Sequence, residues 1–107
     1  MEVHRQLGPG FVEATYQEAL AIEFTKRNIP FEKEKSFDIF YNGVRLSRTY
    51  SPDFICFNEL IVELKAISCI GALEIAQVLG YIKATGIRKA IILNFGETSL
   101  RYKSLIN

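Results

Sequence analysis

Two charged residues interrupt a segment that otherwise has the composition of a buried strand. Residues 60–66 are nearly all apolar, but they include Glu63 and Lys65. Strand side chains alternate between the two faces, so Glu63 and Lys65 point to the same side, about 7 Å apart. Burying either charge is costly unless it is paired or binds a metal. The structural alternatives to a functional site are a buried ion pair between these two residues, or an edge strand with a wet face.

A second carboxylate, that of Asp53, precedes this strand in the chain. A two-residue loop over 58–59 would turn Asp53 to the opposite face of a hairpin. A three-residue loop over 58–60 pairs Asp53 with Lys65 and places both on the face of Glu63, because directly opposed residues project to the same side. We predict the three-residue loop.

Two polar residues lie among apolar neighbours on predicted helices. Glu13 shares a face with Leu20 in a helix expected over 11–27, so we expect it to face the protein. The equally weighted alternative is a first-turn acid favoured by the helix dipole. Gln77 lies in a similar position on a helix over 70–85, where a buried amide could simply cap a sheet carbonyl.

Convergent carboxylates favour one kind of chemistry. Two such groups repel each other unless a divalent cation neutralises them, and oxygen-only ligands suit Mg²⁺ or Mn²⁺. A nearby lysine can orient water and stabilise negative charge at phosphorus. Asp53, Glu63 and Lys65 therefore supply the minimum parts for metal-assisted phosphodiester hydrolysis. His4 is the only histidine, which argues against a zinc site or a Cys–His pair, and no phosphate-binding glycine loop occurs.

The elements that must position these residues follow from turn signals. Asn42-Gly43 is typical of a tight hairpin, Pro52 interrupts a strand, and Gly86 is a helix cap. We expect an α/β fold with a mixed central sheet flanked by helices, in which the second helix crosses between parallel strands. The expected elements are helix 11–27, a meander of strands 31–41, 44–57 and 60–66, helix 70–85, strand 88–95 and edge strand 100–106.

Length and composition indicate one ordinary domain over 1–107. The chain has 107 residues, 49% of them hydrophobic, and a formal net charge of +1. A net charge this close to zero gives no indication of a polyanionic partner. Cys56 and Cys69 are expected to be reduced core residues. The absence of a long apolar run and of an apolar leader favours a cytoplasmic protein without membrane contact.

The motifs together resemble a known nuclease group. Pro52-Asp53, nine intervening residues and Glu63-Leu64-Lys65 resemble the PD-(D/E)xK motif of the restriction-endonuclease-like superfamily. The rest of the chain resembles the small GxxExxY family within it. The segments that carry this second resemblance are Leu7 to Tyr16, Tyr50-Ser-Pro-Asp53, Val62 to Ala66, Ala76 to Tyr81 and Leu93-Asn-Phe-Gly96.

The resemblance implies a restriction-endonuclease-like core of order α-β-β-β-α-β-β and assigns roles by position. Asp53 and Glu63 would bind Mg²⁺ or Mn²⁺, and Lys65 would be the catalytic lysine. Glu13 would complete or support the metal site, and Gln77 would lie beside it. In two respects the chain departs from the family. It begins close to the first helix, as a truncated chain would, and residue 74 is a glutamate where a polar residue, often histidine, is expected.

The implied activity is cleavage of nucleic acid. The expected substrate is DNA, with RNA less favoured, and a homodimer or another partner would enlarge the binding surface of a nearly neutral chain. Alternatives are a catalytically inactive binding module and a hydrolase of a small phosphorylated molecule. The candidate cations for nucleic-acid contacts are Arg45, Arg48, Lys83, Arg88 and Lys89.

Overall fold

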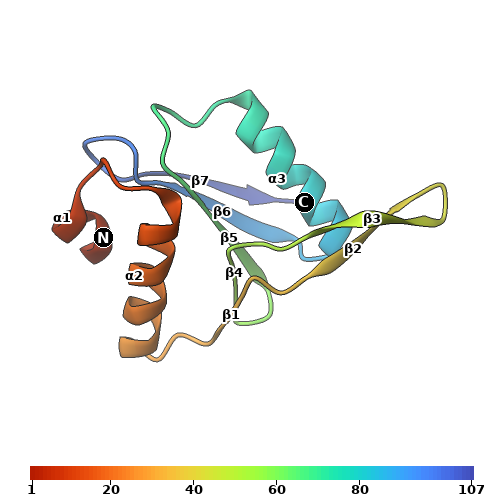
Figure 1. The fold of residues 1–107 in the computed structure, drawn as a ribbon, viewed down its shortest axis with the longest axis horizontal. Coiled ribbons are helices and arrows are strands. Elements are labelled where there is room, and N and C mark those ends of the chain that lie inside the picture. The colour runs from red at the N-terminus through yellow and green to blue at the C-terminus, as the bar shows by residue number, and fades with distance from the viewer.

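The computed structural model describes residues 1–107 and contains three helices and seven strands (Figure 1). The predicted helices and strands are all present, but two of the strands are divided, and a short N-terminal helix was not predicted. The elements are α1 (Glu2–Leu7), α2 (Glu13–Lys26), β1 (Phe31–Lys33), β2 (Phe37–Tyr41), β3 (Val44–Tyr50), β4 (Phe54–Cys56), β5 (Leu60–Lys65), α3 (Ala72–Thr85), β6 (Lys89–Asn94) and β7 (Arg101–Ile106).

The central sheet has five strands in the order β1-β4-β5-β6-β7. Strands β5 and β6 are parallel, as predicted for strands joined through α3, and the other neighbours are antiparallel. The predicted meander is wrong, because β2 and β3 form a separate hairpin that projects from the sheet. The chain leaves the sheet after β1 at Glu34, whose φ is 54°, and returns through Pro52, which cannot donate to a ladder.

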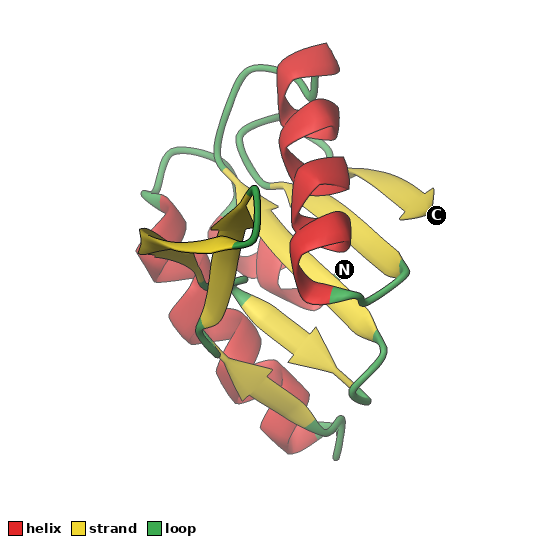
Figure 2. Ribbon diagram, turned by 90° about the vertical axis from the view of Figure 1, so that its right-hand side faces the viewer, coloured by secondary structure: helices red, strands yellow, loops and turns green.

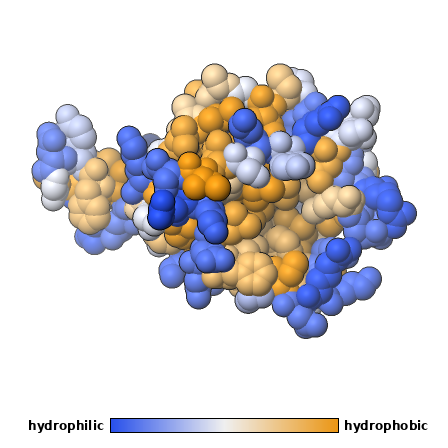
Figure 3. Space-filling model, turned by 180° about the vertical axis from the view of Figure 1, so that it is seen from behind, coloured by the Kyte–Doolittle hydropathy of each residue, from blue (hydrophilic) through white to orange (hydrophobic).

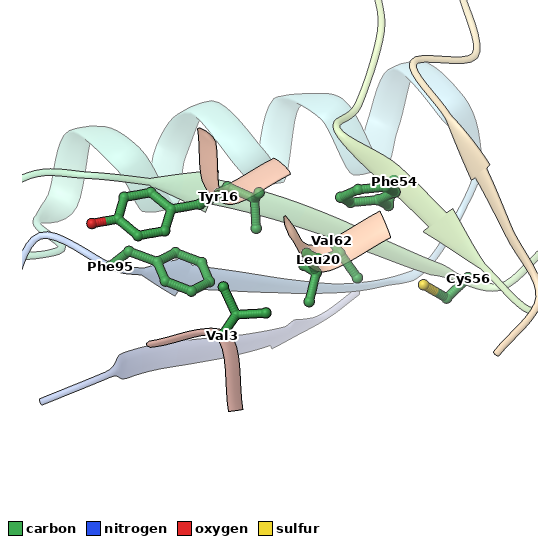
Figure 4. Packing of buried hydrophobic residues seen from close by; sticks show 8 residues of the cluster. Val3, Tyr16, Leu20, Phe54, Cys56, Val62 and Phe95 are labelled. Atoms are coloured by element: carbon green, nitrogen blue, oxygen red, sulfur yellow. The ribbon is translucent and has the colours of Figure 1, made fainter. Parts of the chain in front are cut away.

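Helices cover both faces of the sheet, with α3 on one side and α1 and α2 on the other (Figure 2). Between the sheet and α1 and α2 lies the larger core, which Figure 4 shows. The smaller core lies beneath α3. The larger core comprises Val3, Tyr16, Leu20, Phe54, Cys56, Val62, Leu64 and Phe95, and the smaller one Ile61, Val78, Ile82, Ala90 and Ile92.

Strand β5 is central and buried on both faces, as its composition predicts. Val62 and Leu64 belong to the core under α2, whereas Ile61 belongs to the core under α3. By alternation, Glu63 and Lys65 lie on the α3 side.

The hairpin between β4 and β5 has a three-residue loop, but at 57–59 rather than 58–60. Phe54 pairs with Val62 and Cys56 with Leu60. Phe57 and Asn58 both have φ of 57°, so the chain turns one residue earlier than predicted. Continued past β4, this register sets Asp53 opposite Glu63 instead of Lys65. The predicted pairing of Asp53 with Lys65 is therefore wrong. Asp53 itself lies just before β4, and its carboxylate accepts a hydrogen bond from Gln17 of α2, the helix on the face of the sheet opposite α3.

The end of β6 is fixed to the segment that follows β5. The buried amide of Asn94 accepts from the main-chain N–H groups of Ile67 and Gly96 and donates to the Ile67 carbonyl and to Glu97 Oε2. A Cβ on Gly96 would lie 2.3 Å from the Ile67 carbonyl oxygen, so only glycine allows this approach. The Asn-Phe-Gly segment therefore holds the chain beyond Lys65 in place.

Other expectations meet mixed outcomes. Gly86 caps α3 in the left-handed conformation, with φ of 75°, as predicted. Cys56 is a buried free thiol, but Cys69 is exposed, so the prediction that both lie in the core is wrong for Cys69. None of the helices is both long enough and apolar enough to span a bilayer.

Candidate functional site

Glu63 is a buried acid at the centre of the sheet. Its Oε1 accepts a hydrogen bond from the Tyr50 hydroxyl at 2.7 Å and another from the Asp53 main-chain N–H at 3.1 Å. Its Oε2 makes no hydrogen bond within the protein. Every fully buried polar side-chain atom has a hydrogen-bond partner, so Oε2 must keep some contact with solvent. One oxygen of this carboxylate is thus held by the protein and the other is free.

Asp53 occupies the position where β4 and β5 stop pairing. Its Oδ2 accepts from the Leu64 main-chain N–H at 2.8 Å, and its Oδ1 accepts from Gln17 Nε2 of α2 at 3.1 Å. The main-chain N–H of Asp53 is itself bound by Glu63. Beyond the pair Phe54–Val62, each of these two carboxylates thus accepts a hydrogen bond from a main-chain N–H of the opposite segment, in place of a main-chain carbonyl. These two hydrogen bonds hold Asp53 and Glu63 next to each other.

Both carboxylates are harder to ionise than usual. Burial, then repulsion from Asp53, raises the pKa of Glu63 from 4.5 to about 7. Burial also raises the pKa of Asp53, although the Leu64 N–H opposes this shift, and the Glu13 carboxylate adds repulsion. A bound cation would relieve the repulsion between Asp53 and Glu63.

Lys65 does not pair with either acid. Its Nζ donates to Gln77 Oε1 of α3 at 3.1 Å, and none of the four ion pairs in the protein includes it. The buried ion pair considered as an alternative for Glu63 is therefore absent. Gln77 is exposed rather than buried, and its amide oxygen caps a lysine rather than a sheet carbonyl.

Glu13 is exposed as the first residue of α2, so the expectation that it faces the protein is wrong. It lies one turn before Gln17, the residue that α2 contributes to Asp53. The turn before α2 is anchored by Tyr16, whose hydroxyl donates to the Gly8 carbonyl at 2.6 Å and whose ring stacks on Phe95 at 4.5 Å. No three His, Cys, Asp or Glu side chains converge as a metal-binding group.

Two tyrosines that sequence reasoning left without a role cover the site. Tyr50 stacks on Tyr81 of α3, with ring centroids 3.5 Å apart and an angle of 14° between the planes. Burial, and then the nearby negative charge of Glu63, raises the pKa of both hydroxyls. Tyr50 begins one motif segment and Tyr81 ends another, and this position in the motifs could have indicated a role at the site. For Gln17 the sequence offered only its spacing of one helical turn from Glu13.

The other expected residues are spread over the molecule. Glu74 accepts from the Gly71 N–H at 2.7 Å and so caps the start of α3. Arg45 and Arg48 lie on the projecting hairpin, in β3. Arg88 and Lys89 lie at the start of β6, where Lys89 pairs with Leu60, at the opposite end of β5 from Lys65. Lys83, in the last turn of α3, borders Asp38 to Phe40 of the hairpin.

The comparisons with known proteins identify the family. Residues 1–105 match the PD-(D/E)XK nuclease superfamily, and the chain belongs to it. The crystal structure of a protein named SSO0001 is similar with a TM-score of 0.66 and 15% identity, over 88% of this chain and 49% of that one. These findings confirm the restriction-endonuclease-like core.

A second solved structure is that of an alkaline exonuclease (LHK-Exo) from Laribacter hongkongensis, with a TM-score of 0.47 and 11% identity, over 84% of this chain and 53% of that one. The chain thus spans about half the length of each of these two proteins. None of the curated proteins compared with the chain matches it.

Proposed function

We propose that this chain is a Mg²⁺- or Mn²⁺-dependent nuclease of the GxxExxY type, which hydrolyses phosphodiester bonds of DNA, with RNA less favoured. The observation that carries the proposal is the juxtaposition of Asp53 and Glu63 beside a lysine that neither of them neutralises. A structural ion pair would place Lys65 on an acid, whereas a site that receives an anionic substrate keeps the lysine free.

The donor set suits a hard divalent cation. Asp53 and Glu63 offer only oxygen, repel each other, and include one oxygen, Glu63 Oε2, that accepts no hydrogen bond. Mg²⁺ and Mn²⁺ accept one or two carboxylates and fill their remaining positions with water and phosphate oxygens, so a third protein ligand is not required. When bound, the ion would supply Lewis-acid activation of phosphate and of water. Glu13 would support this charge balance from the exposed start of α2.

The remaining residues would position the reactants. Lys65 would orient the attacking water and stabilise the negative charge that develops on the phosphate oxygens. Gln77 would hold the Lys65 ammonium through its Oε1, so that the ammonium faces the site without pairing to an acid. Tyr50 fixes one oxygen of Glu63 and thereby directs the other outward.

Metal binding tests the site separately from activity. We expect Mn²⁺ to bind the wild-type protein at submillimolar concentration, measured by calorimetry, and Asp53→Asn to lose this binding. Glu59→Gln, which changes an exposed acid in the β4–β5 loop, is the matched control and should bind as wild type does. Equal binding by the wild type and Asp53→Asn would remove the metal site from the proposal.

Cleavage tests the reaction. We expect the wild type with Mg²⁺ to nick supercoiled DNA, Lys65→Met to lose nicking while retaining Mn²⁺ binding, and Lys26→Met, an exposed control, to keep both. A wild type that binds metal but cleaves neither DNA nor RNA would instead be a catalytically inactive nuclease-fold module. Release of phosphate from a small phosphomonoester without nicking would identify a phosphatase.

A further inference from the structure

The β2–β3 hairpin, residues 37–50, is a projecting arm with little role in the core. It belongs to neither face of the five-stranded sheet, and it extends beyond the body of the protein in Figure 1. Three large apolar residues near its tip are mostly exposed: Phe40 by 62%, Tyr41 by 68% and Val44 by 64%. Phe40 borders a pocket with Gly80 and Lys83 of α3, but most of its ring and of the Tyr41 ring remains exposed. Exposed aromatic rings of this size indicate a contact surface.

The same arm carries two uncompensated cations. Arg45 and Arg48 are exposed, and neither takes part in any of the four ion pairs. Arg45 pairs directly across the hairpin from Phe40, so a guanidinium and an aromatic ring lie side by side on one face. In Figure 3 apolar and hydrophilic residues are likewise interleaved on this projection.

The arm begins and ends at the carboxylate site. Its last residue, Tyr50, donates to Glu63, and its base is closed by the hydrogen bond from the Glu34 main-chain N–H to the Asp53 carbonyl at 3.3 Å. Arg48 precedes Tyr50 by two residues of β3. Arg45 and Tyr50 pair with Phe40 and Phe37, which are three residues apart in β2, so Arg45 and Tyr50 lie about 10 Å apart across a β-bulge. A chain of a few nucleotides that lies along the arm would therefore reach Glu63.

We propose that this arm binds a single-stranded segment of nucleic acid and delivers it to Asp53 and Glu63. Arginines contact phosphates, and exposed aromatic rings stack on unpaired bases, which a duplex does not offer. The interpretation rests on the proposed nuclease function, since it names the substrate of that site. The two exposed arginines favour a polyanion over a second copy of this chain, whose formal net charge is +1, and the dimer is an outcome of the test below.

Binding without catalysis tests the arm. Anisotropy of a labelled oligonucleotide of about 12 nucleotides, in EDTA, compares a single strand with the duplex of the same sequence. We expect the single strand to bind more tightly. The double variant Phe40→Ala/Tyr41→Ala should weaken single-strand binding by about tenfold and leave duplex binding unchanged. The double variant Arg45→Ala/Arg48→Ala should lower the salt slope by about 1.4, since each phosphate contact contributes roughly 0.7.

The matched control removes the same charge elsewhere. Arg88 and Lys89 lie near Leu60, at the opposite end of β5 from Lys65. Arg88→Ala/Lys89→Ala should change single-strand affinity less than about twofold, because salt screens exposed charges that do not contact the bound strand. All variants alter exposed residues, and circular dichroism checks their fold. Equal losses in the arm and control variants, or no binding by the wild type, would overturn the proposal. So would a wild-type dimer in sedimentation that Phe40→Ala/Tyr41→Ala dissociates, because the arm would then be a protein interface.

The two proposals fail in different ways. Binding is measured in EDTA, so it does not depend on the proposed metal site. Arm-dependent binding without cleavage would refute the nuclease and keep the arm. If the wild type cleaves nucleic acid but the arm variants bind the single strand as tightly as the wild type does, the nuclease proposal stands and the arm proposal is refuted.

Discussion

The Tyr50 hydroxyl donates to Glu63 Oε1 at 2.7 Å, from a hairpin that is not part of the sheet containing Glu63. This bond joins the projecting arm to a buried acid whose pKa is raised to about 7. It also lowers the pKa of Glu63, against the larger effects of burial and of Asp53.

Tyr50→Phe should destabilise the protein by about 1–2 kcal/mol at pH 8, because a charged, buried carboxylate loses one hydrogen bond. The loss should be smaller at pH 5, where Glu63 is neutral. Urea unfolding measures both values. Tyr102→Phe, whose ring is exposed, is the control and should stay within about 0.5 kcal/mol of wild type. Equal effects of the two substitutions would show that the Tyr50–Glu63 bond contributes nothing.

The protein without metal should lose stability as the pH rises. The folded-state pKa of Glu63, about 7, exceeds its ordinary value of 4.5, so the folded state binds more protons than the unfolded state between these values. The stabilisation is fully present below pH 4.5 and is lost as the pH rises through 7. The loss is at most about 3 kcal/mol. Glu63→Gln should flatten this profile and exceed the wild type in stability at pH 8; a profile unchanged by the substitution would contradict the assignment.

A divalent cation should reverse that loss. At pH 8, Mn²⁺ at one hundred times its Kd should stabilise the wild type by about 2.7 kcal/mol, since it binds only the folded site. At pH 5 the effect should nearly vanish, because protonated Glu63 is a poor ligand. Thermal melts at the two pH values measure the difference. Stabilisation of Asp53→Asn to the same extent at pH 8 would locate the ion elsewhere.

Gly96→Ala should destabilise the protein by several kcal/mol, on the order of 3, because the new Cβ would overlap the main chain of Ile67. Gly80→Ala is the paired control. Its Cβ would meet nothing within 4 Å inside α3, so it should stabilise by about 0.5–1 kcal/mol. Urea unfolding of the two variants should therefore give shifts of opposite sign, and shifts of the same sign would contradict this reading.

Local signals account for the parts of the fold that the sequence predicts. Asn42-Gly43, Pro52 and Gly86 each act through backbone conformation within a few residues, and each is found where expected. The composition of β5 predicts burial on both faces, because no other position in a mixed sheet suits a nearly continuous apolar run. The sequence therefore predicts that Glu63 and Lys65 lie on the central strand, whereas Asp53 lies just before the neighbouring strand and in another register than predicted.

Long-range packing decides the rest. The break at Glu34 depends on β1 pairing with β4, a contact between segments that the hairpin separates. The hydrogen bonds of Gln17 to Asp53 and of Tyr50 to Glu63 join residues from different layers, which residue spacing does not encode. The exposure of Glu13 and Gln77 has the same origin, since the rotation of a helix about its axis is set by the sheet beneath it.

The way in which the hairpin is attached has one more consequence. Strands β1 and β4 pair directly, and the Glu34–Asp53 hydrogen bond closes the gap through which the chain leaves and re-enters the sheet. The arm is therefore an insertion between two strands that already meet. A chain in which a short link replaces residues 35–51 retains every strand of the central sheet, and a longer or differently charged hairpin can be grafted at the same junction. The five-stranded sheet and the projecting arm are thus separate parts of one small protein, joined through the hydrogen bond from Tyr50 to Glu63.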